Sequence, residues 1–374
     1  MIQRSIAPLV AEKLADSKIV VLRGPRKSGR LTLLSGLIDL SDDKVKVIDC
    51  FDKKTRKAID TVASFNQAIS GKSIIVLQEA QLLTQLQAIV DGCFDNDQIE
   101  NLILLCSFEP QLHEALWEAL RFQGLEISLS PISYMESANH FGLAKEAESI
   151  EQRLIFGYYP EVLINEASAE SILLEILESS VFTQLGATER INKKDQLIKL
   201  LRLLSFNIGK VISFNDLGNQ CDLDNETVER YVKLFEKADL LFLLPSYNNG
   251  HRYELKKSFI VYFVDNGIRN ALIRSFHPFE FRNDSIELWK NWTIAERRKA
   301  NLLAGRSVES YFWLTHTKQE VDYLEISESG KFGYKMQWDK RKSIKIPSSF
   351  QTSYPDIKVV GVNQSSFWTF LQKK

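Results

Sequence analysis

Short apolar runs alternate with amphipathic stretches through the first third of the chain. The runs are bounded by polar residues, as is typical of buried strands. The stretches between them, at residues 55–70 and 80–95, place apolar side chains at helical spacing. This alternation predicts an α/β fold with a parallel sheet and helices on both of its faces. The apolar runs cover residues 19–22, 45–50, 73–79 and 101–107, and a further helix is expected at residues 6–17.

The pattern changes in the second half of the chain. Residues 166–205 are rich in Leu, Ile and Glu at helical spacing, which predicts a helical linker or bundle. Two short helices that begin near Ser213 and Asp224, followed by an apolar run, are typical of a winged helix. The last third predicts a long helix and then neighbouring strands of alternating polarity. That helix is expected at about residues 286–303, and the strands at 311–313, 320–324 and 334–338.

A glycine-bounded loop lies between the first apolar run and the helical stretch after it. Its frame is that of a phosphate loop, in which backbone N–H groups hold phosphates, a Lys meets the β- and γ-phosphates, and a Ser or Thr binds Mg²⁺. Arg30 stands at the Lys position, and its guanidinium is bulkier than an ammonium. Leu31 stands at the Ser/Thr position without an oxygen, and Thr32 is turned away by about 100°. The predicted nucleotide-binding residues are Gly24, Pro25, Arg26, Lys27, Ser28, Gly29, Arg30, Leu31 and Thr32.

The third apolar run ends in Gln78 and Glu79. In nucleotide hydrolases of this kind the strand ends in Asp-Glu, where the Asp orders the Mg²⁺ shell and the Glu polarises the attacking water. Gln78 is neutral and is a poor substitute for an anionic metal partner. Glu79 is therefore the candidate catalytic residue, and the alternative is an ordinary carboxylate at a strand end. The corresponding alternative for the loop is a turn that binds no ligand.

Four segments of the chain form a recognisable set, namely Ile2-x-Arg4, Val21-Leu22-x-Gly24-Pro25-Arg26, Leu77-Gln78-Glu79-Ala80-Gln81 and Gly157-Tyr158-Tyr159-Pro160-Glu161-Val162. Together they resemble the prokaryotic AAA-type ATPases that join an N-terminal P-loop domain to a C-terminal domain of unknown function. The resemblance implies an AAA-type P-loop domain at residues 1–165, a helical linker and winged helix at 166–250, and a restriction-endonuclease-like α/β domain at 251–374. Typical members carry Lys-Thr in the loop and Asp-Glu at the strand end, and this chain departs from both.

The resemblance also implies a nuclease-like metal site in the last domain, built from a helix Glu, a strand Asp and Glu-x-Lys on the next strand. Asp322 is in place, with Glu320 beside it. Lys290 stands at the helix Glu position, and Lys335 and Gln337 replace the Glu and Lys of the next strand. We therefore expect Asp322 to form a salt bridge with these lysines and not to hold a divalent metal. This degenerate site predicts no nuclease activity.

Composition indicates the general class of protein but does not identify a binding partner. A chain of 374 residues with 44% hydrophobic and 25% charged residues is typical of a globular protein of two or three domains. The net charge of −1 neither suggests nor excludes nucleic acid. The four cysteines have no metal-binding spacing and predict buried, reduced thiols. Since no apolar stretch approaches the ~20 residues that span a bilayer, we expect a cytoplasmic protein with no membrane partner.

Every predicted site lacks a group that its chemistry requires. We therefore expect a degenerate AAA-family protein that senses nucleotide or acts as a scaffold for an unknown protein partner, with weak or no ATP hydrolysis. ATP or ADP would bind weakly and without Mg²⁺, through the backbone of residues 24–30 and the helix N-terminus. Two alternatives stay open. One is an active ATPase in which Arg30 serves as the Lys, Glu79 polarises water and a rearranged oxygen ligand holds Mg²⁺. The other is a regulator whose winged helix binds DNA or RNA.

Overall fold

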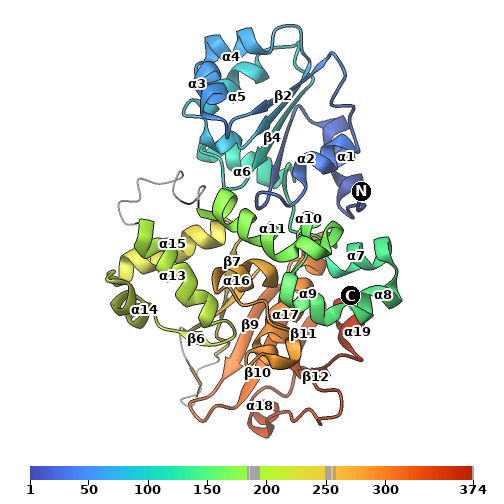
Figure 1. Ribbon diagram of the computed structural model, residues 1–374, viewed down its shortest axis with the longest axis vertical. Coiled ribbons are helices and arrows are strands. Elements are labelled where there is room, and N and C mark those ends of the chain that lie inside the picture. Colours follow the sequence, from blue (N-terminus) through green and yellow to red (C-terminus); the bar gives the residue numbers. More distant parts are fainter. Residues whose placement is uncertain (183–184, 186–193, 249–253, 256–257, 373–374) are drawn as a thin grey trace. The chain divides into compact units, whose positions relative to one another are not determined.

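The computed structural model describes residues 1–182, 185, 194–248, 254–255 and 258–372 (Figure 1). Contacts divide the chain into two compact units. The first contains residues 1–132 with the short segments 178–190 and 237–239, and the second contains the remainder. The division expected at residues 165 and 250 is finer than this one and stays a prediction. Its second boundary lies outside the described residues.

The first unit is built on a five-stranded parallel sheet in the order β2-β3-β4-β1-β5. All four predicted apolar runs are strands of this sheet, which confirms the predicted α/β arrangement. The fifth strand lies at the edge beside β1 and was not predicted, because three residues are too few to show a period. The strands are β1 (Ile19–Arg23), β2 (Val45–Asp49), β3 (Ile74–Gln78), β4 (Asn101–Cys106) and β5 (Glu126–Ser128).

Helices cover both faces of this sheet (Figure 1). The stretch predicted as one helix at residues 55–70 is two helices, because Thr61 begins a new one: its hydroxyl accepts a hydrogen bond from the backbone of Ser64. The stretch predicted at 80–95 likewise begins with a short 3₁₀ turn. The elements are α1 (Ala7–Asp16), α2 (Arg30–Ser35), α3 (Lys53–Ile59), α4 (Val62–Ala68), η1 (Ala80–Leu82), α5 (Leu86–Phe94) and α6 (Glu114–Phe122).

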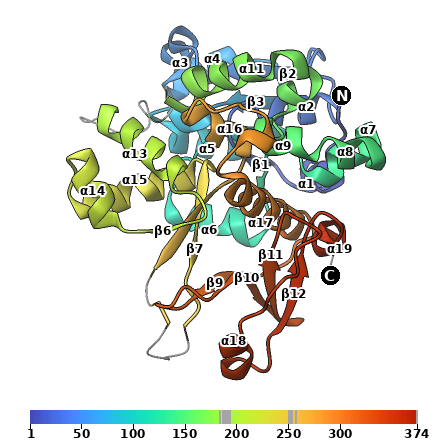
Figure 2. The same ribbon diagram turned by 60° about the horizontal axis from the view of Figure 1, so that its bottom comes forward.

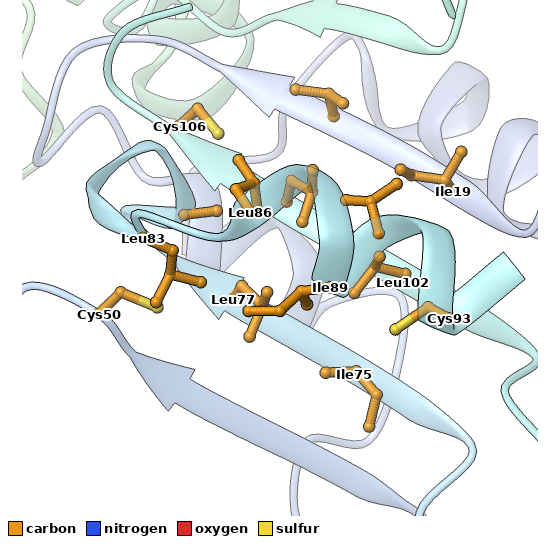
Figure 3. Packing of buried hydrophobic residues seen from close by; sticks show 14 of the residues in the cluster. Ile19, Cys50, Ile75, Leu77, Leu83, Leu86, Ile89, Cys93, Leu102 and Cys106 are labelled. Carbon is orange, nitrogen blue, oxygen red and sulfur yellow. The ribbon is translucent and has the colours of Figure 1, made fainter. Parts of the chain in front are cut away.

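The core on one face of the sheet is drawn in Figure 3. Alternate residues of β1, such as Ile19 and Val21, point into this cluster together with side chains of α5 and β3. Three cysteine side chains pack in it as small apolar groups, and burial raises the pKa of Cys50 and of Cys106 to about 12. The prediction of buried thiols is confirmed, and the raised pKa disfavours the thiolate, which is the reactive form.

The second unit begins with a run of helices. α9 and α16 pack against each other, so the start of this unit is joined to a segment more than 100 residues later. The helical stretch expected at 166–205 is present in part, and its middle lies outside the described residues. The elements are α7 (Tyr134–Phe141), α8 (Leu143–Glu148), α9 (Ile150–Phe156), α10 (Pro160–Ile164), η2 (Glu166–Ser168), α11 (Ala169–Ile176) and α13 (Lys194–Phe206). The π-helix η3 (Leu177–Phe182) follows α11 in the chain, and all of it but Leu177 belongs to the first unit.

Three short strands and two helices follow α13. The strands form an antiparallel sheet in the order β6-β8-β7. Both helices begin where the sequence predicts, because Ser213 and Asp224 accept hydrogen bonds from backbone N–H groups three residues later. The elements are β6 (Val211–Ile212), α14 (Phe214–Cys221), α15 (Asn225–Lys237), β7 (Leu241–Pro245) and β8 (Phe259–Phe263).

The last part of the second unit is a mixed sheet in the order β12-β11-β10-β9, with α17 and α19 packed together beside it (Figure 2). β12 runs parallel to β11, and the other neighbouring strands are antiparallel. The long helix and the three strands expected here are confirmed. The elements are α16 (Asn266–Leu272), η4 (Phe279–Phe281), α17 (Ser285–Leu303), β9 (Glu309–Leu314), β10 (Glu320–Ser327), β11 (Gly330–Met336), α18 (Ser348–Ser353), β12 (Lys358–Val362) and α19 (Phe367–Gln372).

Candidate functional site

The glycine-bounded loop joins the end of β1 to α2, as in a phosphate loop. Gly24 is required there, since a Cβ at this position would lie 2.1 Å from the carbonyl oxygen of Leu129. Gly29 precedes α2 with φ 94°, a left-handed conformation that glycine adopts without strain. These two glycines therefore fit the observed backbone at both ends of the loop, and Gly24 leaves no room for a side chain.

Arg4 holds the loop in place through two hydrogen bonds to backbone carbonyl oxygens. Its Nη1 donates to the carbonyl oxygen of Ser28 at 2.9 Å, and its Nη2 donates to that of Ser130 at 2.7 Å. Arg4 is buried, so these charge-assisted bonds tie the loop to the segment after β5. We did not assign this role from the sequence, where Arg4 was only part of the family pattern.

Arg30 is directed at Glu79. Its Nη2 donates to Oε1 of Glu79 at 2.6 Å and to Oγ of Ser107 at 2.9 Å. Both charged side chains are buried, with Arg30 6% and Glu79 4% exposed. The structure thus brings together the residue at the Lys position of the loop and the candidate catalytic carboxylate.

Glu79 accepts further bonds on its second oxygen. Oε2 accepts from the hydroxyl of Ser107 at 2.7 Å and from Nε2 of Gln81 at 2.9 Å. We call Arg30, Glu79, Gln81 and Ser107 the Arg30–Glu79 network. It links the first turn of α2 to the ends of β3 and β4, and both carboxylate oxygens of Glu79 are engaged within it. Ser107 was missed in the sequence, although its position directly after an apolar strand was a usable signal.

The backbone of Glu79 is also unusual. Its φ is 54° and its ψ 42°, which is the left-handed region that a non-glycine residue rarely adopts. Such conformations persist where the surroundings hold them and cost of order 1–3 kcal/mol each. The ion pair with Arg30 supplies one such restraint.

The remaining loop residues fit an anion better than a metal. Oγ of Ser28 and Nη1 of Arg30 are buried hydrogen-bond donors with no partner among the described residues. Leu31 and Thr32 follow on α2, where Thr32 is exposed to solvent and Leu31 supplies no oxygen. Arg26 stacks its guanidinium 3.6 Å from the centre of the Phe51 ring. A phosphate would meet free donors here, while Mg²⁺ would find no side-chain ligand at the usual position.

In the second unit, four charged side chains meet between α17 and the mixed sheet. They are Lys290 of α17, Glu320 and Asp322 of β10, and Lys335 of β11, and we call them the charge quartet. Nζ of Lys290 lies 2.5 Å from Oδ1 of Asp322 and 2.9 Å from Oε1 of Glu320. Nζ of Lys335 lies 2.7 Å from Glu320 and 3.4 Å from Asp322. The salt bridge expected for Asp322 is present.

These contacts set the charge state of the quartet. Although burial disfavours their charged forms, the two lysines lower the pKa of Glu320 to about 2, and the two carboxylates raise the pKa of Lys290. The Gln337 side chain has no part in the quartet; its backbone N–H donates to the carbonyl oxygen of Val362. The role of these residues as a vestigial nuclease site stays a prediction.

Glu296 is another carboxylate of α17, and it serves a different purpose. Its Oε2 accepts from the backbone N–H of Tyr134 at 2.7 Å, and its Oε1 accepts from Nζ of Lys299 at 2.7 Å. Burial raises the pKa of Glu296, and the charge of Lys299 opposes that rise. Within the described ranges, no group of three or more His, Cys, Asp or Glu side chains is placed to hold a metal ion.

The family segment that begins at Gly157 forms a buried junction with Asp265. The Asp265 carboxylate accepts from the backbone N–H of Tyr158 at 2.7 Å. A Cβ at Gly157 would lie 2.1 Å from that carboxylate, and one at Gly267 would lie 2.2 Å from the carbonyl oxygen of Phe156. These residues therefore join two segments of the second unit by close packing.

Comparisons with known proteins agree with this description of the first unit. Residues 16–138 match a family model described as an AAA domain, and residues 147–278 match a domain of unknown function, DUF8612. A protein of Haemophilus influenzae, described only as uncharacterized, is 23% identical over 286 residues, which are 68% of this chain and 69% of that protein. These matches support an AAA-type, P-loop ATPase domain followed by a domain of unknown function.

Two solved structures are similar to parts of this chain. The Walker-type ATPase of Pyrococcus abyssi is similar with a TM-score of 0.45 and 13% identity, over 73% of this chain and 96% of that one. A signal transduction ATPase with numerous domains from Pyrococcus horikoshii, which has a tetratricopeptide repeat sensor, gives a TM-score of 0.30 and 12% identity. The similarity covers 82% of this chain but only 46% of that protein.

Two further points bear on the predicted partners. No helix in the described part of the chain is long and apolar enough to cross a membrane. The winged-helix and endonuclease-like assignments lie outside what the comparisons identify, and they stay predictions.

Proposed function

We propose that this chain is a non-hydrolysing AAA-type protein that acts by binding, as a nucleotide sensor or a scaffold for a protein partner. The observation that carries the proposal is the buried Arg30–Glu79 network. Hydrolysis requires a cation on the β- and γ-phosphates, an oxygen ligand for Mg²⁺ and a carboxylate that can reach a water. Each of the three is compromised in this chain.

The network occupies two of these groups, the loop cation and the carboxylate, through their mutual hydrogen bond. Arg30 donates to Glu79 and Ser107, so the loop cation is engaged on its protein side. Glu79 accepts bonds on both oxygens, which leaves its carboxylate poorly suited to orient an attacking water. Leu31 removes the third group, because an alkyl side chain cannot bind Mg²⁺. Neutral Gln78 adds no anion that could compensate.

We further propose that ATP or ADP binds weakly and without Mg²⁺. Support for a phosphate in the loop comes from Oγ of Ser28 and Nη1 of Arg30, buried donors for which the described part of the chain offers no partner. A ligand held only by these donors and by backbone N–H groups gains nothing from a metal ion. Binding should therefore be equal in Mg²⁺ and in EDTA, and similar for the two nucleotides.

Thermal unfolding with ATP, ADP or no nucleotide, each in Mg²⁺ and in EDTA, tests both proposals. Ligand at a hundredfold over its Kd stabilises by about 2.7 kcal/mol, which raises Tm by a few degrees. We expect equal shifts in Mg²⁺ and EDTA, no phosphate release, and a smaller shift for Ser28→Ala. A shift that requires Mg²⁺, together with phosphate release by the wild-type protein, would instead establish the active ATPase. No shift at millimolar nucleotide would leave only the scaffold role.

We also propose that α13, α14 and α15 with the strands β6, β7 and β8 form a winged helix that contacts protein and does not read DNA. The support is the order of elements from α13 to β8 together with the β6-β8-β7 antiparallel sheet. On the exposed side of α15, Lys233 lies 2.7 Å from Glu229, so cation and anion neutralise each other where a DNA-reading helix would present positive charge. Gel-shift assays at low salt should show no complex with duplex DNA or RNA. A complex whose affinity falls steeply with salt would support the nucleic-acid regulator instead.

A further inference from the structure

The charge quartet contains two ammonium groups and two carboxylates, so its net charge is zero. Asp322 is its most buried member, with a side chain 1% exposed, against 13% for Lys290 and 19% for Lys335. A buried carboxylate without compensation is strongly disfavoured, so Asp322 requires a cation beside it. The structure supplies that cation from within the chain.

Lys290 is the group that bridges the two acids. Its Nζ contacts Oδ1 of Asp322 at 2.5 Å and Oε1 of Glu320 at 2.9 Å. Nζ of Lys335 lies 2.7 Å from Glu320 but 3.4 Å from Asp322. Lys335 therefore pairs mainly with Glu320. The other oxygen of Asp322 accepts the backbone N–H of Met336 at 2.6 Å, which fixes the direction of the carboxylate.

A divalent metal does not fit this arrangement, although the endonuclease-like resemblance implies one. Mg²⁺ or Mn²⁺ would need the oxygens that Lys290 already contacts, and two ammonium groups would repel it at close range. We propose that Lys290 is a built-in substitute for a divalent cation, and that Asp322 and Glu320 form a latent cation site that removal of its ammonium opens. Wild-type protein is then independent of divalent cations in its second unit. This inference does not depend on the proposed nucleotide chemistry of the first unit.

The variant Lys290→Ala tests the proposal. It leaves two carboxylates and one ammonium, a net charge of −1, with space where the Lys side chain was. Mn²⁺ binding, followed by the EPR signal of the free ion and by calorimetry, should be at least tenfold tighter than in wild type. Mn²⁺ should also raise the Tm of this variant by several degrees. Mg²⁺ should compete with Mn²⁺ for the same site.

Two controls separate a latent site from a general loss of positive charge. Lys335→Ala removes one ammonium from the same quartet but leaves Lys290 between the acids, so Mn²⁺ binding should stay as in wild type. Adding Asp322→Asn to Lys290→Ala should abolish the gained binding. Equal Mn²⁺ affinity in the two single lysine variants would overturn the proposal, as would a folded Lys290→Ala that binds no more Mn²⁺ than wild type.

Folding of the variants also decides the question. If Lys290→Ala folds only when Mn²⁺ is present, the ion has taken over the role of Lys290 and the proposal is supported. Lys290→Met keeps most of the apolar volume of the side chain while removing its charge. If both variants stay unfolded with and without Mn²⁺, Lys290 is irreplaceable by a metal and the idea is wrong.

Discussion

Replacing Glu79 by Gln should destabilise the first unit strongly, because it leaves Arg30 buried without a counter-charge. Arg30 and Glu79 are 6% and 4% exposed, so solvent can do little to screen the loss. Breaking one side of a buried ion pair costs about 3–5 kcal/mol, against about 0–1 kcal/mol for a surface pair. The new amide adds to this cost, since its NH₂ would face the donors of Ser107 or Arg30.

Hydrogen exchange followed by mass spectrometry measures this effect in the first unit alone, which is necessary because a chain of two units does not unfold in one step. Peptides that cover β3 and β4 should exchange about two to four orders of magnitude faster in Glu79→Gln, since 1.36 kcal/mol corresponds to a factor of ten. Glu100→Gln is the matched control, because Glu100 is exposed and precedes β4. That control should leave the exchange of both strands unchanged.

The double variant Arg30→Met with Glu79→Gln completes the experiment. It removes both charges, so no unpaired ion remains, and it should exchange more slowly than Glu79→Gln alone. If Glu79→Gln exchanges within threefold of wild type, the ion pair contributes as little as a surface pair and the network cannot hold Arg30 in place. If the double variant is no better than the single one, the coupling between the two charges is absent.

Two other substitutions test the loop and the quartet. Gly24→Ala should lower Tm by many degrees or prevent folding, because its Cβ would lie 2.1 Å from the oxygen of Leu129; Gly36→Ala, where the nearest contact is 3.4 Å, should lower it far less. The pKa of Glu320 is lowered from 4.5 to about 2 in the folded protein, so the stability that its charge provides is present above pH 4.5 and is lost as pH falls toward 2. Stability measured in urea between pH 5 and pH 2 should therefore decline less steeply in Glu320→Gln than in wild type, and equal slopes would contradict the assigned shift.

The sequence predicted those parts of the fold that rest on local pattern. Apolar runs predicted the buried strands. The N-cap residues Ser213 and Asp224 predicted where two of the helices begin. Strand β5 could not be predicted, since it is short and is defined by its pairing with β1. The break at Thr61 was readable as an N-cap, but the apolar period continues across it, and the period dominated the prediction.

The candidate sites divide in the same way. The family resemblance placed Lys290 and Lys335 beside Asp322, and their opposite charges then predicted a salt bridge. The pairing of Arg30 with Glu79 joins residues 49 positions apart, and it depends on the order of the strands and on which way one long side chain turns. Strand order and side-chain direction do not follow from spacing in the sequence. The sequence showed only that Arg30 stands at the Lys position of the loop and Glu79 at the strand end.

The junction of Gly157, Asp265 and Gly267 has a consequence for how such chains are recognised. Each of the three positions is dictated by contact with backbone or carboxylate atoms inside the second unit. None of them requires a nucleotide, a metal or a free catalytic group. A sequence pattern built on these three positions will therefore find proteins that share this architecture, whether or not they hydrolyse nucleotide. Such a pattern supports the assignment of a fold. Catalytic activity has to be judged on its own, by examining the residues that stand at the positions of Arg30 and Leu31.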